Sequence, residues 1–185
     1  MSNDSVLSHA QSPSHVTRTY LQMHSPAQLS PGDPPVVLPE WIELKHCTSG
    51  EWRSLYRSVG GPWQWQDRHV WSDEQLIAHL AKSDVRIFRI DVEGPAGLMK
   101  GAGFVELERH GDRSVEIAYL GLDLRVLGLG LGRWLVTRAV KEAWAWDATR
   151  VWLHTCTLDA PAALPNYLAR GFEVERTEEY ERTSG

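Results

Sequence analysis

The segment from Leu127 to Arg133 is the part of the sequence whose residue types and spacing point most directly to chemistry. Its order is Leu-Gly-Leu-Gly-Leu-Gly-Arg, and it lies between an apolar run and a stretch with helical periodicity. Alternate glycines let the backbone turn tightly and let a ligand reach main-chain amides without meeting a Cβ atom. A helix start adds N–H groups without intrahelical partners and the positive end of the helix dipole. The segment therefore predicts a phosphate-binding turn.

Two common phosphate-binding fingerprints do not fit this turn. A dinucleotide-binding loop needs a third glycine three places after a close pair, but the pair Gly128 and Gly130 is followed there by Arg133. The pair that begins at Gly130 is followed there by Leu135. A nucleoside triphosphatase loop needs Gly-Lys-Ser/Thr, which this segment lacks. Both classes of site are therefore set aside.

Apolar periodicity and capping residues predict the elements that must position the turn. Capping-box spacing after Thr48 and after Ser72 predicts two early helices, the first of which ends at Gly60. Two later helices are expected at about 132–147 and roughly 161–169. Strand-like runs are expected at 17–23, 40–46, 85–92, 101–108, 114–122, 150–157 and 172–180. Their order favours an antiparallel meander in the middle of the chain and a parallel pair where a long helix separates two strands.

The composition is typical of a globular protein. The 185 residues are 42% apolar and 23% charged, which is enough to bury a core in one domain. We expect residues 1–15, which are rich in Ser, His and Gln, to form a disordered tail. Residues 16–185 are then expected to form a single domain.

Charge and hydropathy argue against several classes of partner. With 19 Lys and Arg against 24 Asp and Glu, the formal charge of −5 favours neither nucleic acid nor an anionic membrane as a partner. The sequence has no run of about 18 apolar residues and no signal-peptide pattern at its start, so a cytoplasmic location is expected. The cysteines at 47 and 156 complete neither a disulfide framework nor a zinc site, so no metal is expected.

The turn resembles the acyl-coenzyme A loop of the GCN5-related N-acetyltransferase (GNAT) superfamily, which is written Gln/Arg-x-x-Gly-x-Gly/Ala. Two registers are open. A motif that starts at Arg125 keeps the basic first residue, whereas one that starts at Leu127 better places Arg133 on the amphipathic start of the family's helix. We prefer the second register, in which Leu127 departs from the family's pattern. The family grips pyrophosphate mainly through main-chain amides, so this departure is compatible with binding.

A second motif lies downstream at the separation that the family shows. Tyr167 begins the sequence Tyr-Leu-Ala-Arg-Gly-Phe, which resembles the family's Tyr-x-x-x-Gly-Phe signature. Together with the element order, the resemblance covers about residues 17–180. A further departure is Ala160, where many members carry an asparagine near the cofactor; Asp159 stands beside it.

The resemblance implies a fold, a co-substrate and a first set of site residues. The implied α/β fold is that of acyl-CoA N-acyltransferases, a mixed and mostly antiparallel sheet with helices on both faces and splayed central strands that hold acetyl-CoA. The residues implied to bind it are Leu120, Gly121, Leu122, Leu127, Gly128, Leu129, Gly130, Leu131, Gly132 and Arg133. The Leu120 N–H would hold the thioester oxygen, and Tyr167 matches the family's general acid. Ordinary core roles are the alternatives for both residues.

Acetyl transfer to an amine also needs a group that accepts a proton. Glu116 lies in the strand that leads to the turn, at a position where some superfamily members carry the general base. The alternative for Glu116 is an exposed strand glutamate. Glu106 and Glu108 are further candidate bases. His154 is another, although a histidine in a strand is more often hydrogen-bonded within the sheet.

The acceptor wall is expected in the aromatic segment at and after the first helix. It contains Tyr56, Trp63, Trp65 and Arg68, in a region that superfamily members commonly use to bind the acceptor. Aromatic faces cage an ammonium group or stack on a ring, and an arginine binds a carboxylate. The alternative is a role in the core, where most tryptophans of a small domain lie.

These expectations describe an N-acetyltransferase that moves an acetyl group from acetyl-CoA directly to a primary amine of a small molecule or peptide, in a ternary complex and without a metal. A homodimer is compatible with the sequence. A non-catalytic CoA-binding regulatory module is the main alternative, and the departures at Leu127 and Ala160 favour it. An interaction protein with a tryptophan-rich surface is a third reading.

Overall fold

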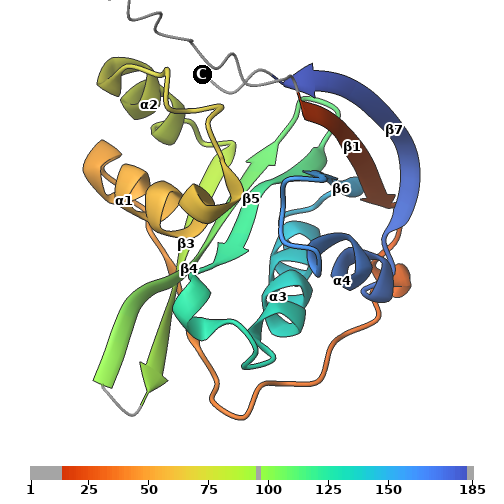
Figure 1. The fold of residues 1–185 in the computed structure, drawn as a ribbon, viewed down its shortest axis with the longest axis horizontal. Helices are drawn as coiled ribbons and strands as arrows, with labels where there is room; N and C mark the ends of the chain where they lie inside the picture. The colour runs from red at the N-terminus through yellow and green to blue at the C-terminus, as the bar shows by residue number, and fades with distance from the viewer. Residues whose placement is uncertain (1–13, 95–96, 183–185) are drawn as a thin grey trace, which may run out of the picture.

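Seven strands form one mixed sheet, and four helices cover its two faces (Figure 1). A computed structural model describes residues 14–94 and 97–182 of the chain. The strands are β1 (Ser14–Met23), β2 (Glu40–Glu43), β3 (Val85–Gly94), β4 (Gly97–Arg109), β5 (Ser114–Leu122), β6 (Arg150–Cys156) and β7 (Glu173–Arg182). The helices are α1 (Ser49–Gly60), α2 (Asp73–Leu80), α3 (Leu131–Ala145) and α4 (Ala163–Ala169).

The strand order is β2-β3-β4-β5-β6-β1-β7. In the described part of the chain β5 and β6 run parallel, and the other neighbouring strands run antiparallel. The expected meander is therefore confirmed for β3, β4 and β5, and the expected parallel pair is β5 with β6. The mixed and mostly antiparallel α/β sheet that the resemblance implied is confirmed as well.

The first two helices begin where their capping residues predict. The Thr48 hydroxyl accepts a hydrogen bond from the Glu51 N–H at 3.2 Å, and the Glu51 carboxylate accepts one from the Thr48 N–H at 3.0 Å. Ser72 and Gln75 form the same reciprocal pair at the start of α2. The apolar stripe of α1 is buried, as its spacing predicts: Trp52, Leu55, Tyr56 and Val59.

Alternation along β4 separates the core into two halves. Phe104 packs with α1 and α2, whereas its neighbour Val105 packs with α3 on the opposite face. Figure 1 shows α1 and α2 on one side of the sheet and α3 and α4 on the other. The predicted helices on both faces are thus confirmed.

β5 and β6 pair only at their beginnings. Their register runs from Ser114 opposite Arg150 to Glu116 opposite Trp152 and ends there. A β-bulge follows at once, because Tyr119 and Ile117 lie opposite consecutive residues of β4. A bulge bends and twists its strand, so β5 turns away from β6 beyond this point. The central strands are therefore splayed, as the resemblance implied.

Several boundaries differ from the sequence expectation: β2 ends at Glu43 rather than 46, β4 begins at Gly97 rather than 101, and the starts of β1 and α4 also shift. β1 begins at Ser14, three residues before the expected 17, because its early residues pair with β7. Most of the tail expected at 1–15 lies outside the described residues. α4 begins at Ala163 rather than 161, with Pro165 in its first turn, where a missing N–H is tolerated.

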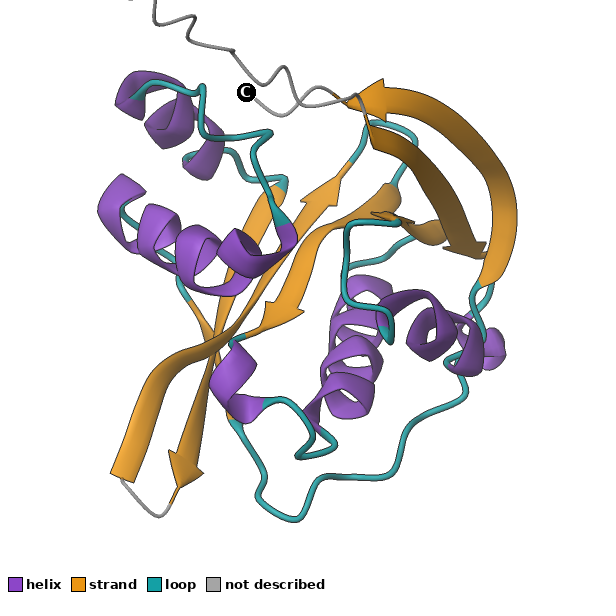
Figure 2. Ribbon diagram, viewed as in Figure 1, coloured by secondary structure: helices purple, strands orange, loops and turns teal. Residues whose placement is uncertain are grey.

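The long connection between β1 and β2 lies against the helices on the α3 side (Figure 2). Its Gly32 N–H donates to the Thr137 hydroxyl of α3 at 3.1 Å, and its Ser30 N–H donates to the Arg170 carbonyl at 3.0 Å. None of the helices in the described part of the chain combines the length and the apolar character needed to cross a membrane.

Candidate functional site

A cavity of about 590 Å³ opens where β5 and β6 diverge. Its walls come from the second half of β5, the turn before α3, the end of β6, the start of α4 and residues 63–67 of the connection between α1 and α2. β1 and β7 contribute at one end. Cavities of this size hold small ligands, and here main-chain groups of β5 line it.

The backbone of β5 offers hydrogen-bonding groups to this cavity. The Asp123 N–H donates to the Ala102 carbonyl at 2.9 Å, and the Gly121 carbonyl faces Gly103, so alternate residues of this segment face β4. Leu120 and Leu122 have the opposite orientation. Their N–H and C=O groups point toward the side that β6 has left, as the proposed contact of Leu120 with a thioester requires.

The glycine turn closes the other side of the cavity. Gly128 and Gly130 have φ angles of 81° and 74°, in the left-handed region that favours glycine. Gly130 is the N-cap of α3, and no side chain caps the first N–H groups of this helix. These amides and the helix dipole form an anion-binding end, which is the arrangement a pyrophosphate needs.

Nine of the ten residues predicted to bind the cofactor line the cavity, and the exception is Leu129, whose side chain is exposed. Arg125 folds back on Asp123, with Nε and Oδ1 2.8 Å apart, and is outside the cavity lining. Leu127 is part of that lining. The geometry therefore favours the register that begins at Leu127 over the one that begins at Arg125.

Tyr167 lies in α4 and lines the cavity while remaining buried. Burial raises the pKa of its phenol, and the negative charge of Asp159 acts in the same direction. A phenol with a raised pKa keeps its proton at neutral pH. Tyr167 is therefore available as a proton donor.

Glu116 lies outside the cavity lining, unlike the cleft-lining base that the sequence suggested. The physical reason is its register: it occupies the last position where β5 still pairs with β6. Its carboxylate lies between two imidazoles, with Oε2 3.2 Å from His110 Nε2 and Oε1 3.7 Å from His154 Nδ1. His154 does line the cavity. His154 thus lies between the cavity and the carboxylate of Glu116.

The four residues predicted for the acceptor wall divide into two pairs. Trp63 and Trp65 line the cavity, whereas Tyr56 and Arg68 do not. Trp65 donates a hydrogen bond from Nε1 to Asp159 Oδ1 at 3.4 Å and so spans the cavity from the α1–α2 connection to the β6–α4 connection. The Tyr56 side chain is buried in the core between α1 and the sheet, where its ring stacks on Trp52.

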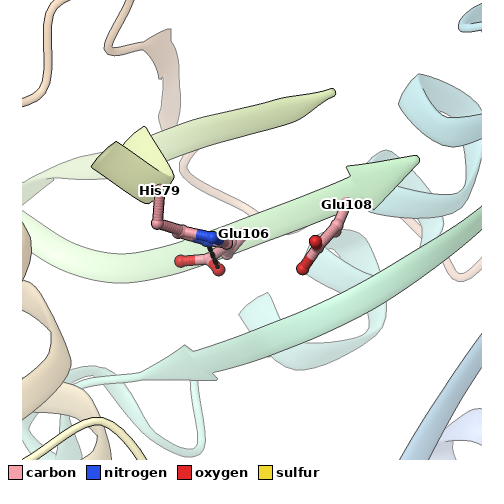
Figure 3. A group of neighbouring side chains, drawn as sticks. All are labelled: His79, Glu106 and Glu108. Carbon is pink, nitrogen blue, oxygen red and sulfur yellow. Dashed lines mark hydrogen bonds and ion pairs between the residues drawn. The ribbon is translucent and has the colours of Figure 1, made fainter. Parts of the chain in front are cut away.

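Glu106, a candidate base in the sequence, is sealed inside the protein. Its side chain is 0% exposed, and its oxygens accept hydrogen bonds from Trp52 Nε1 at 2.6 Å and from Arg68 at 3.4 Å. His79 Nε2 lies 2.9 Å from the same carboxylate, and Glu108 is its neighbour (Figure 3). The Glu106 oxygens are thus occupied by protein donors, and the cluster joins α1 and α2 to β4.

Glu106→Gln is expected to lower the free energy of unfolding by about 2 kcal/mol, because the amide N–H₂ faces either the Trp52 indole N–H or the Arg68 guanidinium, and both of these need an acceptor. Urea denaturation followed by far-UV circular dichroism measures this change. Glu108→Gln is the matched control, expected within about 0.5 kcal/mol of the parent. Equal stabilities of the two variants would contradict the role given to Glu106.

Comparison with known proteins shows to which family this chain belongs. The profile of the acetyltransferase (GNAT) family matches residues 51–172, which contain most of α1, all of α2 to α4 and most of the cavity lining. The chain belongs to the GNAT acetyltransferase family. Membership supports acyl transfer as the class of reaction. Among curated proteins, none matches this GNAT sequence.

Solved structures share the GNAT fold at low sequence identity. A GCN5-related N-acetyltransferase from Kribbella flavida is 17% identical with a TM-score of 0.60, and the match covers 91% of this chain and 58% of that one. One from Sphaerobacter thermophilus is 12% identical with a TM-score of 0.60, covering 92% of this chain and 53% of that one. The chain thus spans little more than half the length of these two proteins, and at such identities the similarity concerns the fold alone.

Sequence reasoning missed part of the GNAT cavity. Arg18 of β1 and both Tyr180 and Arg182 of β7 line it, beside His154 and Cys156 of β6. They reach it because β1 lies between β6 and β7, with Arg18 opposite Cys156. The spacing of residues along the chain carries no signal for this strand order.

Proposed function

We propose that the protein is an N-acetyltransferase that transfers an acetyl group from acetyl-CoA directly to a primary amine of a small molecule or peptide. The observation that carries the proposal is the cavity that joins the outward-facing backbone of β5 to the uncapped start of α3. Family membership supports the class of reaction. Both cysteines are free thiols, which fits a cytoplasmic compartment.

The donor half of the cavity fits acetyl-CoA. The α3 amides and the turn at Gly128 and Gly130 would bind the pyrophosphate, where the missing Cβ atoms leave the backbone accessible. The outward-facing groups of Leu120 and Leu122 would pair with the pantetheine arm as an added strand. The co-substrate supplies an acetyl thioester, and the Leu120 N–H stabilises negative charge on its carbonyl oxygen during attack.

Protons move through side chains of this chain. An amine must lose a proton to attack, and His154 is the titratable ring that lines the cavity. Its Nδ1 is 3.7 Å from Glu116, which leaves Nε2 for the amine and places a carboxylate behind the imidazolium that forms. Glu116 is therefore a positioning residue. Tyr167 donates the proton that the departing thiolate takes up.

Incubation with acetyl-CoA and a panel of primary amines tests the proposal. Release of free thiol that depends on an amine, with a product 42 mass units heavier by mass spectrometry (roughly the mass of an acetyl group less a proton), supports transfer to nitrogen. Thiol release without an acetylated amine, or no release with any amine class, would contradict it.

His154→Gln is expected to lower kcat/KM about 30-fold near pH 7, because water and Glu116 replace the imidazole only in part. The loss should shrink as the pH approaches the amine's own pKa of about 10, since the amine then arrives neutral. A pH–rate profile of both proteins measures this. His46→Gln, at an exposed histidine outside the cavity, is the control. A deficit that is constant with pH would argue against a base.

A non-catalytic CoA-binding module is the second candidate. Ala160 lines the cavity at the position where many family members carry an asparagine, so one polar contact to a cofactor is missing there. Such a module predicts a rise in melting temperature with CoA and no amine-dependent thiol release. The acetylation assay therefore separates the two candidates.

A further inference from the structure

Arg18 is a cation in the cavity wall that forms no ion pair with the carboxylates of the described residues. It projects from β1 on the face that also carries His154 and Cys156 of β6. Among the described residues, no carboxylate oxygen forms an ion pair with its guanidinium. Its Nε is buried and has no hydrogen-bond partner in the described part of the chain. A buried donor left in this state costs free energy unless a ligand satisfies it.

The acidic side chain opposite Arg18 is already engaged by other groups. Glu178 of β7 lies opposite Arg18 in the strand register. One of its oxygens accepts a hydrogen bond from the Tyr20 hydroxyl at 3.0 Å, and the other accepts one from Arg176 Nε at 3.2 Å. Arg18 instead lies over the ring of Tyr180, 5.1 Å from its centroid. The ring supports the guanidinium from one face, and the side chains of Tyr20 and Tyr180 also interact with it, so the buried Nε is the donor left for another partner.

Other partly buried arginines of the described chain are paired. Arg86 binds both Glu43 and Glu142 at 2.8 Å, and Arg89 binds Asp91 at 2.8 Å. These pairs follow the usual rule that a cation removed from water has an anion nearby. Arg18 departs from the rule in the wall of a cavity that a ligand can enter. The departure is therefore informative about the ligand.

We propose that the amine acceptor carries an acidic group, a carboxylate or a phosphate, and that Arg18 binds it with a planar pair of N–H donors. The inference rests on the proposed acetyl transfer and specifies its substrate class. Arg182, which donates to the Gln64 carbonyl at 2.9 Å, adds positive charge at the same end of the cavity. Asp67 also lines the cavity and is exposed, so it offers a negative charge to the ammonium group of an acceptor that enters. The acceptor is thus zwitterionic, with its amine toward His154 and its acid toward Arg18.

Matched pairs of amines test this selectivity. α-Amino acids and ω-amino carboxylic acids are each assayed beside their carboxamides, and aminoalkyl phosphates beside the corresponding amino alcohols. The parent protein is expected to favour the acidic member about 10- to 100-fold in kcat/KM, which is the usual strength of a charge-assisted pair. Arg18→Gln should abolish the preference by slowing the acidic member alone, and Arg18→Lys should restore part of it.

The control variant is Arg150→Gln, at the far end of β6, where the arginine pairs with Glu175 outside the cavity lining. It should keep the preference. Equal rates for acids and carboxamides in the parent, or a preference that survives Arg18→Gln, would overturn the proposal. Which acid is preferred, carboxylate or phosphate, identifies the group.

A binding measurement separates this inference from the proposed function. Calorimetry with N-acetylated amino acids and their carboxamides, in the presence of CoA, reports recognition without turnover. Tighter binding of the acid by about 10-fold or more, lost in Arg18→Gln, supports the acidic subsite even if no acetylation is seen. Amine-dependent acetylation without any preference in rate or binding would retain the proposed function and overturn the role of Arg18.

Discussion

Tyr167→Phe is expected to slow turnover about 1000-fold while CoA binds within about twofold of the parent, because proton donation by a positioned acid contributes that much to rate. The phenyl ring keeps the packing of Tyr167 with Phe172 and removes only the hydroxyl. Since burial raises the pKa of this phenol, the group remains protonated throughout the neutral range and the loss should be independent of pH there. Single-turnover acetylation and calorimetry with CoA measure the two quantities.

Tyr20→Phe is the matched control for this result. Its hydroxyl donates to Glu178 and lies outside the cavity lining, so its removal should change kcat by less than about threefold. If Tyr167→Phe retained full activity, or if it lost CoA affinity in proportion to rate, the hydroxyl would not be the acid. Acetyl thioesters of thiols with a lower pKa provide a further check. Their leaving thiolates depend less on a proton donor, so the slower turnover of Tyr167→Phe should be partly relieved with them.

Gly130→Ala is expected to weaken CoA binding about 30-fold, because a Cβ atom disfavours the left-handed backbone that aims the first amides of α3, at a cost of up to about 2 kcal/mol. The nearest atom to that Cβ would be Arg133 NH2 at 3.2 Å, the end of a flexible side chain. The cost is thus conformational rather than steric. Calorimetry with CoA measures the affinity, and circular dichroism confirms that the variant is folded.

Gly132→Ala is the control that tests whether CoA binding needs the left-handed φ angle of Gly130 or simply a glycine at each position of the turn. Gly132 is helical, and a Cβ there would meet Asn166 Nδ2 at 3.7 Å, which is an ordinary contact. Its affinity for CoA should stay within about threefold of the parent, which agrees with a motif whose last position accepts alanine as well as glycine. Similar losses in Gly130→Ala and Gly132→Ala would mean that the φ angle is not what matters.

The features that the sequence predicted well depend on local physics. Capping boxes at Thr48 and Ser72 place α1 and α2 because a side chain and an amide three residues apart satisfy each other. The glycine turn was predictable because glycine adopts the left-handed φ angles found at Gly128 and Gly130 at much lower cost than other residues. The Tyr167 signature was predicted from the resemblance to the family and not from local physics, and the structure places that residue in the cavity wall.

The features that escaped prediction depend on contacts between distant segments. The bulge in β5 moves the cavity wall beyond Glu116, and alternation along one strand does not reveal an unpaired extra residue. The burial of Glu106 arises from donors on α1, α2 and the loop between them. Arg18 reaches the cavity through a strand order that joins residues 138 positions apart, as its pairing with Cys156 shows (156 less 18).

The residues that line the cavity come from two parts of the chain, one inside the family profile and one outside it. The profile shared with the family ends at Phe172 and starts at Glu51, so it includes the donor half and excludes β1 and β7. Those two outer strands supply Arg18, Tyr180 and Arg182. On the proposal made for Arg18, substitutions confined to β1 and β7 should change which acceptor is used and leave the proposed acetyl-CoA site unchanged. These two strands are then the segments to exchange between relatives when a new specificity is sought.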